Sequence, residues 1–326
     1  MRSLLVALLL TSACAPDSTP AAHPASSPWC RWQEYPNNPI IQPRSGQTII
    51  GDPTFLPPAE TPDHRWHMYA YALDGLDHFT SADGIEWTRV ESALFGNLHL
   101  RPYLLHEGDT YYLFDETFAT PLSSYTEVRM SPDLRVWSAP KKLLSPTLPW
   151  EQAVQRTTGN PFVIRVDDRW RLYYSASQVY LHDSLYFEPT YISVAYADDI
   201  TGPYTKLGKP LFSPDPNDPY RNLGAGSLKL LPEKIGGKWL ALNNGIYEDA
   251  AGHSRSAIML LSSDDGLTFT PMCDQPILAP KPGWQRAYVY AFAARQIGDT
   301  IWLYYNARDG WLEGKERIGL ATLKVP

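Results

Sequence analysis

The chain has 326 residues, which is enough for two ordinary domains or one large all-β domain. It has a net charge of −7 at pH 7 and no run of basic residues, which argues against nucleic acid as a partner because phosphate binding needs clustered Lys and Arg. Aromatic residues make up 13% of the chain, and 30 Pro and 21 Gly accompany them. This composition predicts many short β-strands joined by turns.

The N-terminus has the pattern of a targeting segment. "MRSLLVALLLTSAC" contains one early Arg, an apolar run too short to span a bilayer, and small residues before Cys14. It resembles a bacterial lipoprotein signal, which implies that residues 1–13 are removed and that Cys14 is lipidated. Residues 14–28 are of low complexity and typical of a flexible tether. We therefore expect an exported protein, periplasmic or at the cell surface, that meets a membrane only through a lipid anchor; a plain secretory signal is the alternative.

One hairpin motif recurs along the chain: a polar turn, then a strand of alternating aromatic and apolar residues. The copies are "HRWHMYAY" at 64–71, "GDTYYLFDE" at 108–116, "DDRWRLYYS" at 167–175, "GGKWLALNN" at 236–244 and "GDTIWLYYN" at 298–306. An apolar run precedes each turn, and four copies are followed by an aspartate turn such as "SADGIEW" and a closing segment such as "QPILAP". Each repeat thus contains four strands in about 50 to 70 residues, the size of a β-propeller blade.

The last repeat lacks its fourth strand, and the N-terminus offers a match for it. "WQEYPNNPIIQP" (32–43) resembles "FTPMCDQPILAP" (269–280) in length, in its opening aromatic residue and in its closing P-I-[IL]-x-P. We therefore predict an all-β domain over 29–326: a five-bladed β-propeller of four-stranded antiparallel blades, with the ring closed by the N-terminal strand completing the last blade. The blades are expected at about 49–95, 98–146, 157–214, 222–280, and 286–326 plus 29–43. Two stacked β-sandwiches are the alternative, which leaves the match unexplained.

In a propeller, the first strand of each blade lines the axis and the second strand runs antiparallel beside it. The start of the first strand and the end of the second therefore share one face. In the aligned repeats, the first strands begin at Asp52, Arg101, Asn160, Gly226 (or Ala225) and Ala291, and the second strands end at Tyr71, Glu116, Ser175, Asn244 and Asn306. Polar residues in a buried strand need partners, so we expect a ligand site on this face; a water-filled axial channel is the alternative.

Two cysteines remain inside the predicted domain, Cys30 and Cys273. Export permits a disulfide, but nothing in the sequence brings the two together, and we expect separate thiols. No group of Cys or His has zinc spacing, and "DPNDPYRN" (215–222) lacks a calcium-loop pattern. No metal or other cofactor is therefore expected.

The predicted blades, with "GDPTF" (51–55) on the first axial strand, resemble the five-bladed glycoside hydrolases. These are the arabinanase and β-xylosidase families (family 43-like), their invertase and levansucrase relatives, and more distant agarobiose-hydrolase and mannoside-phosphorylase groups. In those enzymes the Asp of blade 1 is the general base or the nucleophile, and the resemblance implies this role for Asp52. Two further family carboxylates are absent. Asn160 stands where the family has an Asp before Pro, and Ala225 or Gly226 stands where it has the general acid Glu.

Glycoside cleavage needs a second protonatable group. The candidates are Glu116 at the end of a second strand, Glu248 in the blade-4 loop on the side where the family places its acid, and His253 a few residues further on. An ordinary loop or surface role is the alternative for each. Arg101 can bind an anionic group of a ligand, or pair with Asp52 or Glu116 and keep it ionised; we favour the pairing.

These observations predict an exported glycoside hydrolase that acts on terminal sugars or short oligosaccharides of a polysaccharide by carboxylate acid/base chemistry. The predicted catalytic residues are Asp52, Glu116 and Glu248. The predicted carbohydrate-binding residues are Arg101, Asn160, Tyr71, Ser175, Asn244, Asn306 and His253. The alternatives are a non-catalytic glycan-binding propeller and a relative that transfers glycosyl or phosphoryl groups.

Overall fold

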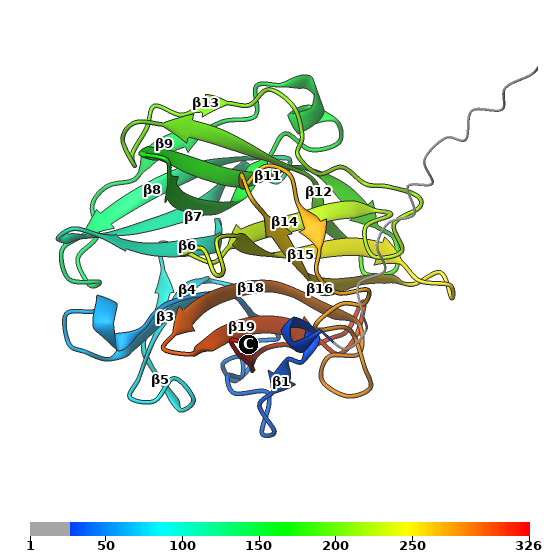
Figure 1. Ribbon diagram of the computed structural model, residues 1–326, viewed down its shortest axis with the longest axis horizontal. Coiled ribbons are helices and arrows are strands. Elements are labelled where there is room, and N and C mark those ends of the chain that lie inside the picture. The colour runs from blue at the N-terminus through cyan, green and yellow to red at the C-terminus, as the bar shows by residue number, and fades with distance from the viewer. Residues whose placement is uncertain (1–26) are drawn as a thin grey trace, which may run out of the picture.

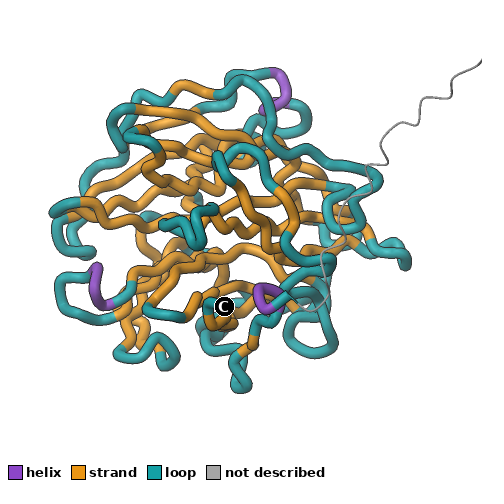
Figure 2. The backbone as a smooth tube through the Cα atoms, viewed as in Figure 1, coloured by secondary structure: helices purple, strands orange, loops and turns teal. Residues whose placement is uncertain are grey.

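The computed structural model describes residues 27–326. Within this range the chain forms β-strands and three short 3-10 helices, η1 (Pro28–Cys30), η2 (Pro58–Glu60) and η3 (Pro149–Gln152), but no α-helix (Figure 2). Over the same range, no helix has the length and apolar character needed to cross a bilayer. The predicted signal peptide, Cys14 and most of the predicted tether lie outside the described residues.

The strands form antiparallel groups of four, which we number units 1 to 5 in chain order (Figure 1). Unit 1 contains β2 (Ile50–Leu56), β3 (Trp66–Ala72), β4 (Gly75–Ser81) and β5 (Trp87–Leu94). Unit 2 contains β6 (His99–Glu107), β7 (Thr110–Thr120), β8 (Ser123–Ser131) and β9 (Lys141–Leu144). Unit 3 contains β10 (Thr158–Val166), β11 (Arg169–Leu181), β12 (Tyr186–Ala197) and β13 (Thr205–Lys206). Unit 4 contains β14 (Gly224–Leu230), β15 (Trp239–Glu248), β16 (Ser254–Ser263) and β17 (Thr270–Pro271). Unit 5 contains β18 (Tyr288–Ile297), β19 (Thr300–Arg308), β20 (Glu316–Lys324) and β1 (Gln33–Glu34).

Units 1, 2 and 3 are separate four-stranded sheets, and units 4 and 5 join into one eight-stranded sheet through a single parallel bridge between Ser256 and Tyr288. Strands that neighbour each other within a unit are consecutive in sequence, apart from β1, which pairs antiparallel with β20 (Figure 1). The first strands of the units contact one another in cyclic order, β2, β6, β10, β14, β18 and back to β2. The all-β prediction with four-stranded antiparallel sheets is confirmed, and the arrangement is consistent with a propeller.

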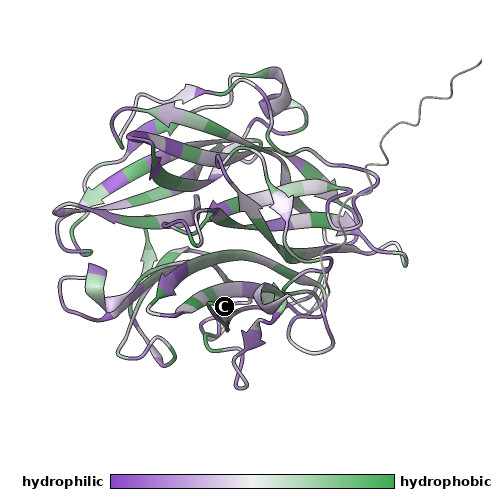
Figure 3. Cartoon of the chain, in the orientation of Figure 1, coloured by the Kyte–Doolittle hydropathy of each residue, from purple (hydrophilic) through white to green (hydrophobic). Residues whose placement is uncertain are grey.

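The aromatic residues of the repeated hairpins hold neighbouring units together. Apolar and polar residues alternate along the strands (Figure 3), and the apolar ones pack between units. Three tyrosines of the second strands also donate their hydroxyl hydrogens to turns of the next unit. These bonds run from Tyr69 to Leu134 O (2.6 Å), from Tyr173 to Gly266 O (2.7 Å) and from Tyr304 to Gly84 O (2.6 Å). Because a buried tyrosine needs a partner for its hydroxyl, the hairpins and the aspartate turns recur together in the sequence.

Cys30 and Cys273 form a disulfide, so the expectation of separate thiols is wrong. Their sequence separation is 243 residues, and their Cα atoms lie 5.8 Å apart. The pairing arises because the segment around η1 packs against the residues that follow β17, with Trp29 and Met272 in the same apolar cluster. Only this tertiary contact brings the two sulfurs together, which is why no local sequence pattern indicated it.

Candidate functional site

Each first strand is interrupted near its start by a β-bulge relative to the second strand. The bulges fall at Asp52–Pro53, Arg101–Pro102, Asn160–Pro161, Ala225–Gly226 and Tyr290–Ala291. In the first three, the residue before proline has a positive φ, of 49° for Asp52, 54° for Arg101 and 48° for Asn160. A bulge locally ends the ladder and re-aims a side chain, and it tolerates proline because no ladder hydrogen bond is needed there. Five units therefore present their bulged residues to one region.

The observed pairing corrects the alignment of the repeats in units 4 and 5. The second-strand residues opposite the bulges are Tyr71, Glu116, Ser175, Ile246 and Ala307. Asn244 thus lies two residues, and Asn306 one residue, before the expected position, and Tyr290 rather than Ala291 is equivalent to Asp52. In unit 4, the turn between the first and second strands spans residues 231–238. In unit 5, the first strand has one more residue between its bulge and its turn than the first strand of unit 2 has. Strand register follows turn and strand lengths, so both shifts have a local cause.

The bulges surround a cavity of about 310 Å³. Five of the predicted site residues line it: Asp52, Tyr71, Arg101, Asn160 and Asn244. Beneath it a separate, small pocket of about 10 Å³ lies between first strands of all the units, at Thr54, Tyr103, Phe162, Lys229 and Ala293. There Lys229 Nζ donates to Phe292 O (2.6 Å) and Arg295 Nε donates to Phe55 O (3.1 Å). The cavity is therefore closed at its base and opens on one face.

Three predicted residues lie in the shell behind the lining. Ser175 Oγ donates to Gly226 O (2.6 Å). Asn306 Oδ1 accepts the Asp52 N–H (3.1 Å), and its Nδ2 donates to Glu316 Oε1 (2.5 Å). The third, Glu116, is buried and is described below. These side chains support the lining residues instead of facing the cavity.

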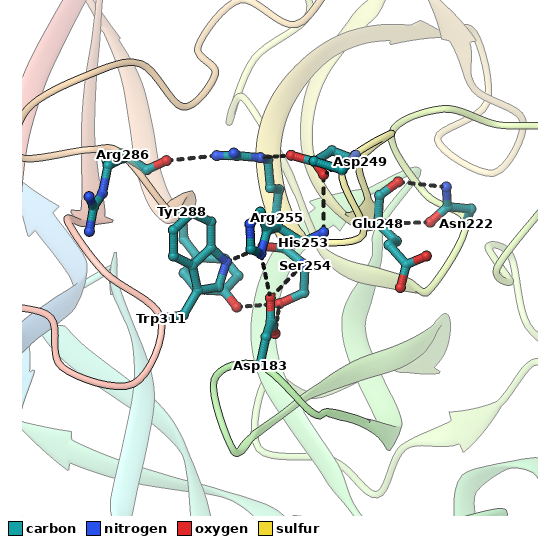
Figure 4. A network of polar contacts seen from close by, with 11 residues as sticks. Asp183, Asn222, Glu248, Asp249, His253, Ser254, Arg255, Arg286, Tyr288 and Trp311 are labelled. Carbon is teal, nitrogen blue, oxygen red and sulfur yellow. Dashed lines mark hydrogen bonds and ion pairs between the residues drawn. The ribbon is translucent and has the colours of Figure 1, made fainter.

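Glu248 is the last residue of β15, and His253 lies in the loop that follows; both are exposed and outside the cavity lining (Figure 4). Asn222 bonds the backbone of Glu248, accepting its N–H (2.8 Å) and donating to its carbonyl (3.3 Å). The His253 ring stacks on Trp311, with ring centroids 4.5 Å apart. The structure does not bring either residue to Asp52, and we do not carry them into the proposed site.

Arg101 and Glu116 form an ion pair of 2.7 Å, the pairing favoured from the sequence. The other oxygen of Glu116 accepts a hydrogen bond from Ser124 Oγ (2.6 Å). The carboxylate packs so tightly on Gly159 that a Cβ there would lie 1.8 Å from Glu116 Oε2. With both oxygens engaged, Glu116 orients Arg101 and is poorly placed to give a proton to a ligand.

Asp52 combines burial with a cationic surrounding. Burial raises the pKa of its carboxyl, whereas the charges of Arg101 and Lys229 and the backbone N–H of Arg101 act to lower that pKa. The carboxylate therefore sits in a desolvated position with fixed positive partners, an arrangement typical of catalytic carboxylates.

Two cavity carboxyls escaped the sequence reasoning, because both come from third strands. Glu188 lies on β12 and Glu316 on β20, and both line the cavity. Burial raises the pKa of Glu188 to about 7, with Arg101 lowering it and Asp52 raising it. Each has one signal that could have found it: Glu188 precedes a proline within an apolar strand, and Glu316 opens the apolar run "RIGLATL".

Glu316 is built into a network around Asp52. Besides the bond from Asn306, its carboxylate lies 3.9 Å from Arg308 Nη1. A Cβ at Gly51, the residue before Asp52, would meet Glu316 Oε1 at 2.3 Å. Burial raises the pKa of Glu316 to about 8, a hydrogen bond with Tyr290 lowers it, and the charge of Asp52 raises it. Glu316 therefore supports the Asp52 bulge from the neighbouring unit.

The turn between β11 and β12 ties unit 3 to units 4 and 5 across one side of the cavity (Figure 4). Asp183 accepts hydrogen bonds from the backbone N–H of Ser254 (2.8 Å) and from its hydroxyl (2.5 Å). The Ser254 hydroxyl also bonds the Tyr288 hydroxyl (2.5 Å), and Tyr288 lines the cavity. Further along, the Arg308 guanidinium lies 4.8 Å from the Tyr186 ring centroid. These contacts fix the start of the strand that carries Glu188.

Among residues 27–326, one group has the composition of a metal site: His99, Asp115 and Glu127, whose ligand atoms lie within 4.8 Å of one another. Arg129 already contacts both carboxylates, at 3.2 Å from Asp115 Oδ2 and 2.8 Å from Glu127 Oε1. The guanidinium therefore fills the position that a cation would need, and the group does not line the cavity.

No protein-family model and no curated protein matches the sequence. Solved structures do match. A glycoside hydrolase, described as putative, from Bacteroides ovatus superposes with a TM-score of 0.62 at 14% identity, covering 89% of this chain and 96% of its own. The β-1,2-mannobiose phosphorylase of Listeria innocua, in complex with β-1,2-mannobiose, gives 0.60 at 14%, covering 90% and 97%. A point mutant of the Cellvibrio cellulosa α-L-arabinanase gives 0.58 at 12%, covering 84% and 91%. The chain shares their fold. At such identities the activity has to be argued from the cavity itself.

Proposed function

We propose that the protein is a glycoside hydrolase that removes a terminal sugar, with Asp52 and Glu188 as its catalytic pair. The observation that carries the proposal is that these two carboxyls line one closed-ended cavity in different electrostatic surroundings. With a pKa of about 7, Glu188 holds a proton near neutral pH. Burial raises the pKa of Asp52 as well, and the positive charges of Arg101 and Lys229 beside it favour its ionised form. Two carboxyls held in different protonation states are what glycoside cleavage requires.

In the proposed reaction, Glu188 donates its proton to the glycosidic oxygen as the bond to the anomeric carbon breaks. Asp52 takes a proton from the water that attacks that carbon. The sugar leaves with a new hydroxyl, and exchange with solvent removes the proton from Asp52 and returns one to Glu188. The attacking water loses one proton to Asp52 and the leaving group gains one from Glu188, so the reaction needs no other reactant.

The remaining lining residues suit a sugar ring. Asn160, Asn244, Gln155 and Gln178 supply amide donors and acceptors for hydroxyl groups, and Tyr71 supplies an aromatic face. The closed base limits entry to the end of a glycan. Both features support a terminal sugar over an internal position of a polysaccharide.

We also propose that the five units are the blades of a propeller whose ring β1 closes. The cyclic contacts of the first strands and the pairing of β1 with β20 support this. A lipid anchor before residue 27 would fit the same geometry. Pro28 lies beside Thr300 and Lys324, at the ends of β19 and β20 opposite to Arg308 and Glu316. Because a nine-residue strand spans about 27 Å, the point where the described chain begins lies about that far from the cavity end of these strands.

The test is a screen of plant, algal and bacterial wall glycans for released monosaccharide, using wild type and the variants Asp52→Asn and Glu188→Gln. Each variant should lower kcat/KM by about 10²- to 10⁴-fold, as expected for a lost proton transfer. Glu248→Gln is the matched control and should leave kcat/KM unchanged, since Glu248 lies outside the cavity. Wild type that binds glycans but releases no sugar would support the glycan-binding alternative, and turnover that survives both variants would remove the pair from the mechanism.

A further inference from the structure

The exposed large apolar side chains gather on the face where the cavity opens. Nine such residues are exposed among the described residues. Seven of them lie at the cavity ends of the strands, six in turns or connections and Tyr186 as the first residue of β12. We call these seven the apolar rim: Leu73, Leu98, Leu122, Val154, Leu185, Tyr186 and Leu312. Of the other two, Val90 lies within the outer strand β5, and Val136 lies in the turn after β8, at the end of the strands away from the cavity. A clustered apolar surface marks an interaction site more strongly than scattered residues do.

Every member of the rim is connected to the cavity lining. Leu73 and Tyr186 line the cavity themselves. Leu122, Val154 and Leu185 each adjoin a lining residue in the chain. The last two are joined by hydrogen bonds: Leu98 O accepts from the Phe118 N–H (3.0 Å), and Leu312 O accepts from Arg308 Nη2 (3.3 Å). The rim residues therefore lie in the segments that surround the mouth of the cavity.

The chemistry of the rim differs from that of a carbohydrate platform. Sugars stack on aromatic rings, but six of the seven rim residues are aliphatic. None of the 11 Trp is exposed, and all of them lie in residues 27–326. Trp311, in a loop of the same face, has its ring covered by His253 at 4.5 Å and by Arg255 at 5.2 Å. The rim is thus mainly aliphatic, in contrast to the cavity lining, which includes Tyr71, Phe118 and Phe187.

We propose that the apolar rim binds the non-sugar part of an amphiphilic glycoside whose terminal sugar occupies the cavity. The inference rests on the proposed function, because a closed-ended cavity that takes a terminal sugar leaves the rest of the substrate at the mouth. An alkyl or lipid-like aglycone fits the exposed leucines of the rim.

The test uses the Asp52→Asn protein, so that turnover does not consume the ligand. Binding is measured by titration calorimetry with methyl and n-octyl glycosides of glucose, galactose, mannose and arabinose, with the octyl compounds below their critical micelle concentrations. For at least one sugar, the octyl glycoside should bind 10-fold or more tightly than its methyl counterpart, since burial of two methylene groups corresponds to roughly that factor. Equal affinities within every pair, or no binding by any pair, would overturn the proposal.

The variant Leu122→Ser/Leu185→Ser/Leu312→Ser, made in the same protein, should reduce the octyl preference to less than 2-fold. These side chains are 63%, 59% and 60% exposed, so the substitutions leave the core intact. The matched control Val90→Ser/Val136→Ser should keep the full preference, and an equal loss in both variants would overturn the assignment to the rim. Two other occupants are also tested. If wild type binds neutral phosphatidylcholine vesicles, or dimerises, and the triple variant does neither, the rim serves a bilayer or a second copy, and the proposal is wrong.

The two proposals fail separately. An octyl preference that the triple variant abolishes, in a protein that cleaves no glycoside, would reject hydrolysis and keep the rim as a glycoside-binding surface. Cleavage that depends on Asp52 and Glu188, without any alkyl preference, would keep hydrolysis and reject the rim.

Discussion

The two ends of the same strands are built in opposite ways. At the end away from the cavity, aspartate turns such as those of Asp83 and Asp133 accept backbone N–H groups, and these bonds lower the pKa of both carboxyls. At the cavity end the ladders are interrupted by bulges, and burial raises the pKa of Asp52, Glu188 and Glu316. The end with the aspartate turns, the regular end, contributes to stability. The cavity end holds desolvated carboxyls and residues with unusual backbone conformation at the candidate site.

The largest effect is expected at the cavity end, from Glu188→Gln. Activity of the wild type should fall as pH rises through about 7, because a general acid has to be protonated and the pKa of Glu188 is about 7. The variant should lose about 10²- to 10⁴-fold in kcat/KM at pH 6 and should lose this alkaline limb as well. Profiles of kcat/KM between pH 4 and 9 provide the measurement. An unchanged alkaline limb in the variant would assign the proton to another group.

The second effect belongs to the opposite end, where the disulfide joins the N-terminal segment to the residues after β17. Cys30→Ser/Cys273→Ser should lower the free energy of unfolding by about 4 kcal/mol, because the bond closes a long loop between residues 243 apart. Activity at 25 °C should persist, since neither cysteine is near the cavity. Urea unfolding of oxidised wild type, reduced wild type and the double variant gives the comparison. Equal stability of all three would show that packing around η1 suffices.

The regular end was more accessible to sequence reasoning than the cavity end. The hairpins and turns repeat because each of these tyrosine hydroxyls bonds a turn of the next unit, and each turn aspartate accepts N–H groups of its own turn. The same contacts in several units leave the same sequence pattern. The positions of Asp52, Arg101 and Asn160 were predicted for the same reason, because the repeated hairpins align them at the starts of the first strands. The bulges at these positions were not predicted. Glu188 and Glu316 escaped because their burial depends on packing against another unit, which no repeat spacing encodes. The disulfide escaped for the same reason.

A third effect concerns how stability of the fold depends on pH at the cavity end. The pKa of Glu316 is raised from the 4.5 of an exposed group to about 8, so its contribution is fully present below pH 4.5 and is lost as pH rises through about 8. Wild type should therefore lose a few kcal/mol of stability between pH 5 and 9 through this group. Glu316→Gln should remove most of that slope, as measured by urea unfolding across this range. A variant with the wild-type slope would place the buried proton elsewhere.

Glycines at the two ends respond differently to the same substitution. Gly226, in the bulge of unit 4, has a φ of +67°, and an added Cβ would lie 1.7 Å from Asn244 O. Gly236, in the turn at the opposite end, has a φ of +59° and no heavy atom within 4 Å of such a Cβ. Gly226→Ala should therefore cost about 3 kcal/mol, and the matched variant Gly236→Ala about 1 kcal/mol. Thermal unfolding of both variants measures the difference, and equal losses would mean that backbone conformation alone sets the cost.

The smallest effect is at the aspartate turns, and its pH dependence has the opposite sign to that of Glu316. Asp133 Oδ1 accepts the N–H groups of Arg135 and Val136, each at 2.9 Å, and these bonds lower its pKa below 3.8. Asp133→Ala should cost about 1 kcal/mol at pH 7. A lowered carboxyl pKa gives stability that is present above the unfolded value of 3.8 and is lost as pH falls through the folded value, so wild type and variant should converge in acid. Unfolding curves at pH 7 and pH 3 test this. If the difference instead grew in acid, the turn carboxylates would be neutral in the folded protein, and the contrast between the two ends would fail.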